Sequence, residues 1–192
     1  MKYDEIAASV QSEMPAKRWK HTQGVIAESI RLAEKYHANL EQARIAATLH
    51  DVAKFWPIER QREVVISENV QNDVLAHDPQ LWHAHAGAIV AEHKYGVADP
   101  EILRAIRYHT SGRVGMSLLE KIVCLADYIE PGRDFAGVER LRSLAQTSLE
   151  EALIYGFGGT IATLIEHGKP IYPLTVLARN DLILQMSQED KE

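Results

Sequence analysis

The sequence predicts an all-α fold, on three observations. Apolar residues recur at the three- and four-residue spacing of helices, as they do from Val25 to Ala33. We find no convincing alternating pattern of a strand and no Asn-Gly or Asp-Gly pair of the kind that closes a hairpin. Capping residues, prolines and glycines separate the apolar segments at helical lengths. We therefore expect a bundle of helices.

The first third of the chain is predicted to form three helices. Apolar residues over 3–10 mark a short helix, and Pro15 opens a second helix that carries His21. Asn39, with Gln42 three residues later, resembles a capping box, in which two side chains bond each other's backbone amides. The helix that this box starts is expected to end at a histidine–aspartate pair.

The middle of the chain is predicted to continue in the same way. A smaller helix covers 59–67, and a loop over 73–79 precedes another helix that runs from about 81 to 95. The Asp99-Pro100 pair supplies an N-cap followed by proline at the first helical position. The helix that starts there leads to His109.

Capping boxes also mark the last third. One box at Ser117 starts a helix that Pro131-Gly132 stops, and a second box at Thr147 starts a long helix over 147–167. A last helix follows the prolines at 170 and 173 and reaches about Met186. The chain has no internal repeat, low-complexity linker or break in composition. We therefore predict one domain over 1–186 and a flexible tail over 187–192.

Composition narrows the class of protein. With 192 residues, of which 46% are hydrophobic, the chain can bury the core of one domain. Its net charge of -6 argues against binding a nucleic-acid polymer, because phosphate backbones demand a basic face. No segment approaches the roughly 18 apolar residues of a membrane span. Cys124 is the only cysteine, and the N-terminus lacks the apolar stretch of a signal peptide. A cytoplasmic location is expected.

The adjacent residues His50 and Asp51 are the first candidates for chemistry. Neighbouring helical side chains point roughly 100° apart, so both can bind one ion that lies in the wedge between them. Imidazole and carboxylate ligands suit iron, manganese, zinc or magnesium. By itself the pair is weak, because a histidine among apolar residues is more often part of the core.

Further residues strengthen the case for a metal site. His21 lies on the preceding predicted helix, His83 and His109 lie near the ends of two later ones, and Asp127 follows the apolar run over 122–126. A carboxylate in such a setting needs a partner to offset its desolvation. One cation bound by four residues would provide it: His21, His50, Asp51 and Asp127.

The order of these residues, all on predicted helices, resembles the HD superfamily of metal-dependent phosphohydrolases. Longer segments resemble its YqeK-type group, known as symmetrical diadenosine tetraphosphate hydrolases, which release two ADP. These segments are RWKH (18–21), LHDVAK (49–54), WHAHAGA (82–88), IRYHTSGR (106–113), MSLLEKIVCLADYIEPGRDF (116–135) and PIYPLTVLARN (170–180). The resemblance covers nearly the whole chain. That group usually lacks a histidine at position 85, so His85 is not expected to be a ligand.

The resemblance implies an HD-domain helical bundle, a homodimer and a small dinucleotide substrate. It also implies iron as the metal, although the ligand set accepts manganese or zinc. The catalytic residues are then Asp51, Lys54, His83 and His109, which also contact substrate. His83 and His109 would bind the scissile phosphate or act as general acid; a second metal at these two histidines is the alternative. Lys54 would neutralise charge that develops on the phosphate.

Other residues are expected at the substrate by resemblance. Arg18, Thr110 and Arg133 match positions that contact the phosphates, and arginine suits this because its planar fork binds phosphate oxygens in pairs. Arg133 could equally form a surface ion pair with Asp134. A wall against the base or ribose is expected from Pro170, Ile171, Tyr172, Pro173, Leu174 and Thr175, with Tyr172 as a stacking face.

Three other functions compete with this prediction. A nucleotidase or a guanosine polyphosphate hydrolase would use the same metal centre, and only the substrate-contacting segments separate them. A nucleotide-sensing module without catalysis typically loses a ligand or the phosphate-binding lysine, whereas this chain has all four ligands and Lys54. A helical scaffold with structural histidines would leave Asp127 without a reason to lie among apolar residues.

Overall fold

The computed structural model describes residues 1–67 and 73–189, which form ten α-helices, two short 3-10 helices and no strand. The all-α prediction is confirmed. In chain order the helices are α1 (Tyr3–Glu13), α2 (Ala16–Lys35), α3 (Leu40–Leu49), α4 (Ile58–Ser67), η1 (Asp73–Ala76), η2 (Pro79–Leu81), α5 (Trp82–His93), α6 (Pro100–Tyr108), α7 (Leu118–Ile129), α8 (Val138–Leu144), α9 (Leu149–Glu166) and α10 (Pro173–Glu189). None of the helices in these residues is long and apolar enough to cross a membrane.

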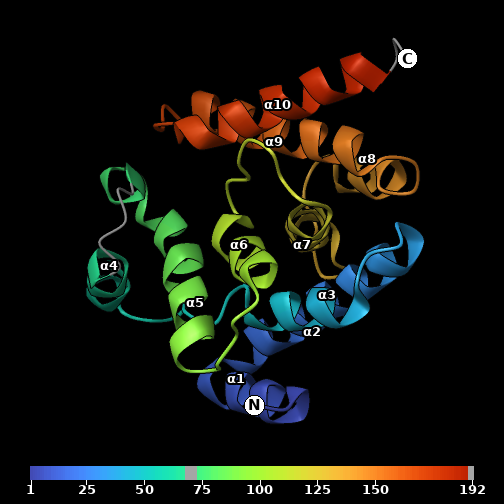
Figure 1. The fold of residues 1–192 in the computed structure, drawn as a ribbon. Helices are drawn as coiled ribbons and strands as arrows, with labels where there is room; N and C mark the ends of the chain where they lie inside the picture. The colour runs from blue at the N-terminus through green and yellow to red at the C-terminus, as the bar shows by residue number, and fades with distance from the viewer. Residues whose placement is uncertain (68–72, 190–192) are drawn as a thin grey trace.

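Helix α7 lies in the middle of the bundle (Figure 1) and packs against α2, α3, α6, α8 and α9. Its five residues over 122–126 are fully buried, as expected for a helix enclosed on several sides. The main core runs without a break from Ile6 in α1 to Leu182 in α10. Because the first and last helices share this core, the prediction of a single domain is confirmed.

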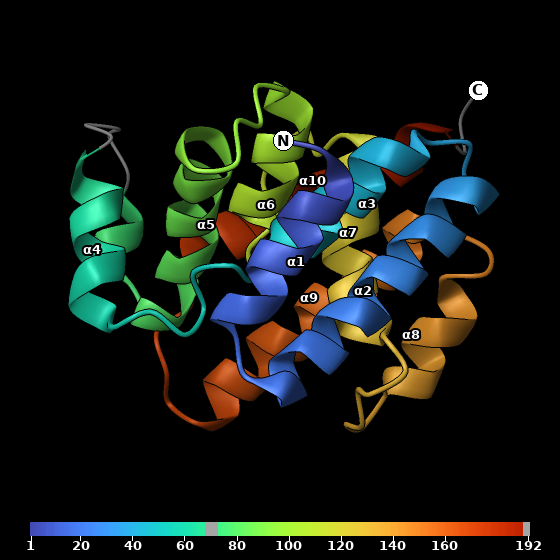
Figure 2. The ribbon, with the colours of Figure 1, turned by 90° about the horizontal axis from the view of Figure 1, so that it is seen from below.

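A smaller apolar cluster lies at the side of the bundle where α4 packs against α5. Figure 2 shows α4 at the left edge, far from α8 at the right. The cluster joins Val65 of α4 to Trp82 and Ala86 of α5, and Tyr172 before α10 closes it. Tyr172 thereby ties the start of the last helix to the region around α4.

Two of the three predicted capping boxes need correction. Ser117 and Glu120 form the predicted capping box. Asn39 accepts hydrogen bonds from two amides of α3, but the Gln42 side chain donates to Asp99 instead of closing a box. Ser148, one residue after the predicted position, is the N-cap of α9, because the hydroxyl of Thr147 donates to Leu144 O.

Other differences concern short or terminal elements. Helix α8 was not predicted, and the expected loop over 73–79 contains η1 and the start of η2. Helix α10 continues to Glu189, beyond the predicted end near Met186. The rest of the predicted tail, 190–192, lies outside the described residues.

Candidate metal centre

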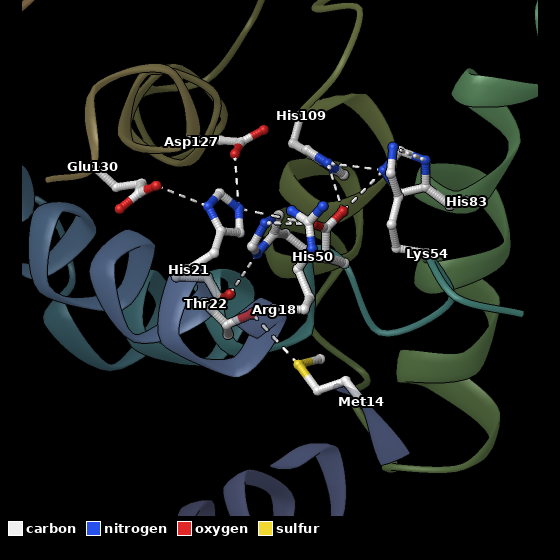
Figure 3. A network of polar contacts seen from close by, with 12 residues as sticks. Met14, Arg18, His21, Thr22, His50, Lys54, His83, His109, Asp127 and Glu130 are labelled. Carbon is white, nitrogen blue, oxygen red and sulfur yellow. Dashed lines mark hydrogen bonds and ion pairs between the residues drawn. The ribbon is translucent and has the colours of Figure 1, made fainter. Parts of the chain in front are cut away.

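Six polar residues converge where α2, α3, α5, α6 and α7 meet (Figure 3). They are His21 in the interior of α2, His50 and Asp51 at the end of α3, His83 in the first turn of α5, His109 at the end of α6, and Asp127 in α7. All six were predicted from the sequence. The structure brings them together.

Asp51 lies at the centre of the group, and its two oxygens face different pairs of histidines. Oδ2 is 3.4 Å from His50 Nε2 and 3.8 Å from His21 Nε2. Oδ1 is 3.0 Å from His83 Nε2 and 3.7 Å from His109 Nε2. A single carboxylate therefore links all four imidazoles.

The residues present fit a divalent cation. One set of ligand atoms, from His21, His50 and Asp127, lies within 4.8 Å of one another, and so does a second set from His50, Asp51 and His109. The Nε2 atoms of His21 and His50 are buried and have no hydrogen-bond partner. Orphaned buried nitrogens are costly, and imidazole with carboxylate is a donor set that transition metals bind.

The histidines are oriented by their other ring nitrogen. Nδ1 of His50, His83 and His109 lies 2.7, 2.7 and 2.8 Å from the carbonyl oxygens of Ala47, Gln80 and Ile106. Each carbonyl belongs to the residue three positions earlier. An Nδ1–H that donates to a carbonyl leaves the lone pair on Nε2, which is the atom that faces the cluster.

Burial and charge set the protonation of the cluster. Burial alone would raise the pKa of Asp51, but His50 and His83 hold it well below its ordinary value. Asp127 likewise has a lowered pKa, because His21, His50 and the Arg133 guanidinium beside it outweigh the effect of burial. Burial, reinforced by the nearby histidines, lowers the pKa of His109 to about 3. Carboxylates that stay ionised beside a neutral imidazole are suited to bind a cation.

Lys54 lies at the edge of the cluster, one turn beyond the histidine–aspartate pair. Its Nζ is 3.3 Å from His83 Nδ1 and donates to Gln80 Oε1 at 3.4 Å. Burial lowers the pKa of Lys54, while Asp51 opposes this shift. The ammonium group of Lys54 thus lies next to His83, where the sequence predicted a phosphate contact.

The two predicted arginines pair with the cluster's carboxylates. Arg18 Nη1 donates to Asp51 Oδ2 at 2.9 Å and its guanidinium lies 5.4 Å from the centre of the exposed Phe55 ring. The Arg133 guanidinium donates to both the carboxylate and the backbone carbonyl of Asp127, rather than pairing with Asp134. The turn after α7 folds back on the helix and brings the two together.

The remaining predicted substrate residues lie at different depths. Thr110 is half-buried in the turn that follows His109. Tyr172 is only 6% exposed, and its hydroxyl donates to Asp73 Oδ1 at 2.9 Å. Its ring also packs on His77, with 4.8 Å between the ring centres. Tyr172 is therefore not an open stacking face, whereas Pro170 and Pro173 beside it are exposed.

Sequence reasoning missed one residue at the cluster. Glu130, which caps the end of α7, is buried, and His21 Nδ1 donates to its Oε1 at 3.0 Å. One signal was present in the sequence. A carboxylate at the C-terminal end of a helix opposes the helix dipole and calls for a local reason.

A comparison with known families decides what kind of domain this is. The model of the HD domain family matches residues 18–132, a range that contains all six residues of the cluster. The chain belongs to the HD domain family. Its fold and its histidine–aspartate order are those that the sequence resemblance implied.

Individual HD proteins are similar over nearly their whole length. The chain is 44% identical to a Bacillus subtilis protein named "Bis(5'-nucleosyl)-tetraphosphatase, symmetrical", over 95% of this chain and 98% of that protein. A protein of the same name from Halalkalibacterium halodurans is 42% identical over 92% and 94% of the two chains. The crystal structure of a "predicted HD superfamily hydrolase involved in NAD metabolism" from Clostridium acetobutylicum matches with a TM-score of 0.92 and 41% identity, over 96% of this chain and 98% of that one.

Proposed function

We propose that this chain is a metal-dependent hydrolase that cleaves diadenosine tetraphosphate symmetrically into two ADP. The observation that carries the proposal is the 44% identity to the Bacillus subtilis symmetrical tetraphosphatase over 95% of the chain. The convergence of four histidines and two aspartates beside Lys54 supports it, because hydrolysis of a phosphoanhydride needs these kinds of group.

In this proposal His21, His50, Asp51 and Asp127 hold the cation, and iron is the proposed metal, with manganese or zinc as alternatives. A divalent cation at such a site lowers the pKa of water and polarises a phosphoryl oxygen. The lowered pKa values of the two carboxylates favour this role, since both stay ionised. Their negative charge balances that of the divalent metal.

His83, His109 and Lys54 are proposed to face the scissile phosphate. A bound polyphosphate adds negative charge beside the two imidazoles, which favours their protonated forms. They can then donate hydrogen bonds to phosphate oxygens or give a proton to the departing ADP. Lys54, next to His83, neutralises charge that develops on the phosphate.

Residues around the cluster are proposed to hold the rest of the dinucleotide. Arg18 and Arg133 have side chains that are 23% and 36% exposed, so each can reach a phosphate from the side that faces away from its aspartate. Thr110 would add a hydroxyl. Because Tyr172 is buried, the wall against base or ribose would come from the exposed prolines on either side of it. The homodimer and the cytoplasmic location stay predictions.

Anaerobic hydrolysis of diadenosine tetraphosphate tests the proposal. The purified protein is assayed with Fe²⁺, with Mn²⁺ and with a chelator, and the nucleotides are separated by chromatography. We expect ADP as the sole product and no reaction with the chelator. AMP with ATP would overturn the symmetrical cut. Turnover of a mononucleotide or a guanosine polyphosphate alone would assign the chain to another branch of the family.

A further inference from the structure

We propose that Glu130 is the positioning residue for His21, and that position 24 is glycine because Glu130 occupies the space that a side chain would need. The inference rests on the proposed metal centre. It concerns how that centre is built, and neither residue is among its proposed ligands.

His21 differs from His50 and His109 in its position along its helix. His50 and His109 follow the last turns of α3 and α6, where the final carbonyls have no partner within the helix. Each uses such a carbonyl to fix Nδ1. His21 lies inside α2, where carbonyls are taken by the amides four residues later. It therefore needs an acceptor from another part of the chain.

Glu130 supplies that acceptor from the end of α7 (Figure 3). Its Oε1 accepts from His21 Nδ1 at 3.0 Å, and its Oε2 accepts from the amide of Gly132 at 2.6 Å. Both carboxylate oxygens of Glu130 thus accept a hydrogen bond, and the residue is only 4% exposed. Because Nδ1–H of His21 donates its hydrogen bond to Glu130, the lone pair of the ring lies on Nε2. This atom faces Asp127 Oδ1, 3.1 Å away.

The backbone around Glu130 is fixed from a third helix. Arg142 of α8 donates through Nη2 to the carbonyls of Glu130 and Arg133, at 2.9 and 3.0 Å, and through Nε to that of Ile129 at 3.1 Å. The carbonyls of Ile129 and Glu130 lie at the end of α7, where helical partners run out, and that of Arg133 lies in the turn that follows. Arg142 therefore holds the turn from which Glu130 reaches His21.

Gly24 leaves room for the carboxylate. A Cβ at position 24 would lie 2.5 Å from Glu130 Oε2 and 3.3 Å from its Cβ. Real Cβ atoms do not approach that closely, so any side chain there would displace Glu130. Glycine in a helix interior is destabilising relative to alanine. Its presence in the middle of α2 is explained by the space that Glu130 takes.

The test is metal binding by two single variants that leave every proposed ligand in place. Co²⁺ affinity is measured by competition with a chelating indicator, and the visible spectrum of the Co²⁺ form reports the ligand geometry. We expect Glu130→Ala and Gly24→Ala each to bind Co²⁺ about 10- to 100-fold more weakly than the wild type, with an altered spectrum. The melting temperature of metal-free Gly24→Ala should not fall.

Controls separate this effect from general damage. Gly159→Ala is the matched helical glycine, since nothing lies within 4 Å of a Cβ added there, and it should bind Co²⁺ as the wild type does. In the Glu130→Ala background, Gly24→Ala should have no further effect on affinity, because it acts through Glu130.

Each other outcome decides against a particular claim. Wild-type affinity in folded Glu130→Ala, or in Gly24→Ala, would overturn the inference while leaving the proposed function intact. Absence of Co²⁺ binding by the wild type would overturn the metal centre itself. If Glu130→Ala does not fold, Gly24→Ala alone decides.

Discussion

His83 and His109 meet at their Nε2 atoms, 3.3 Å apart, although 26 residues separate them in the chain. Because Nδ1 of each donates to a backbone carbonyl, both Nε2 atoms face the gap as acceptors. Asp51 Oδ1 lies 3.0 Å from the first and 3.7 Å from the second. Three acceptors in contact require a shared proton or cation. A second metal would supply the cation, whereas in the proposed one-metal site protonated imidazoles would donate to the substrate's phosphate.

Replacement of His109 separates these two roles. We expect His109→Ala to lower kcat by about 10²-fold or more, the usual contribution of a group that transfers a proton, while the metal content per chain stays at that of the wild type. Elemental analysis and steady-state kinetics measure the two quantities. His167→Ala, at the exposed histidine that follows α9, is the control. Loss of one of two metal equivalents would show instead that the two histidines hold a second ion.

Removal of the central carboxylate should destroy the site and spare the fold. Asp51→Ala removes one of the four proposed ligands, so metal should be lost on purification. Activity should fall by at least about 10³-fold, because the several kcal/mol that a metal supplies to the transition state disappears. Elemental analysis, assay and far-ultraviolet circular dichroism test this. A loss of helical signal would mean that the cluster is mainly structural.

Lys54 can be tested without touching a metal ligand. Since its Nζ lies beside His83, Lys54→Met should lower kcat by about 10²- to 10³-fold through loss of charge stabilisation in the transition state. Metal content and melting temperature should remain those of the wild type. Lys169→Met, at an exposed position, is the matched control. A rise in KM with kcat unchanged would assign Lys54 to ground-state binding alone.

His85 makes the stability of the metal-free protein depend on pH. It is 3% exposed, and burial, with a smaller contribution from Arg107, lowers its pKa to about 3. In the unfolded chain the imidazole of His85 becomes protonated near its ordinary pKa of 6.5. Between pH 6.5 and 3 the unfolded state therefore binds more protons than the folded state. The contribution of His85 to stability is therefore complete above pH 6.5 and is lost as the pH falls.

The variant His85→Gln has no titratable side chain at this position. We expect the difference in free energy of unfolding between wild type and variant to shrink as the pH falls below 6.5, by up to about 1.4 kcal/mol per pH unit. Urea unfolding of chelator-treated protein at several pH values measures it. Parallel curves for the two proteins would contradict the prediction.

Much of the fold was predictable because its signals are local. The Ser117 capping box and the Asp99-Pro100 start lie beside the residues they act on, and the structure has both. Most of the six residues of the cluster stood out because they occur in apolar helical segments, and the order of His21, His50-Asp51 and Asp127 matched the HD superfamily. Where the signal was weak, prediction failed. The N-cap residue of α8 is Gly137, which has a positive φ of 94° and no side chain that could cap the helix.

Contacts between distant segments could not be predicted from local pattern. Nothing near Arg133 in the sequence indicates that it turns back to Asp127, because the turn that brings it there is held by Arg142 of the next helix. Tyr172 was expected at the substrate, yet it is buried by packing against α5 and η1. Such placements depend on the whole bundle, not on helical periodicity.

The contact between His21 and Glu130 spans 109 residues of chain. During synthesis the ribosome has already made five of the six cluster residues when it reaches Cys124, but Asp127 and then Glu130 are still to come. The proposed metal site therefore cannot assemble before 130 of the 192 residues have been made, although the helices that carry His21, His50 and Asp51 are complete much earlier.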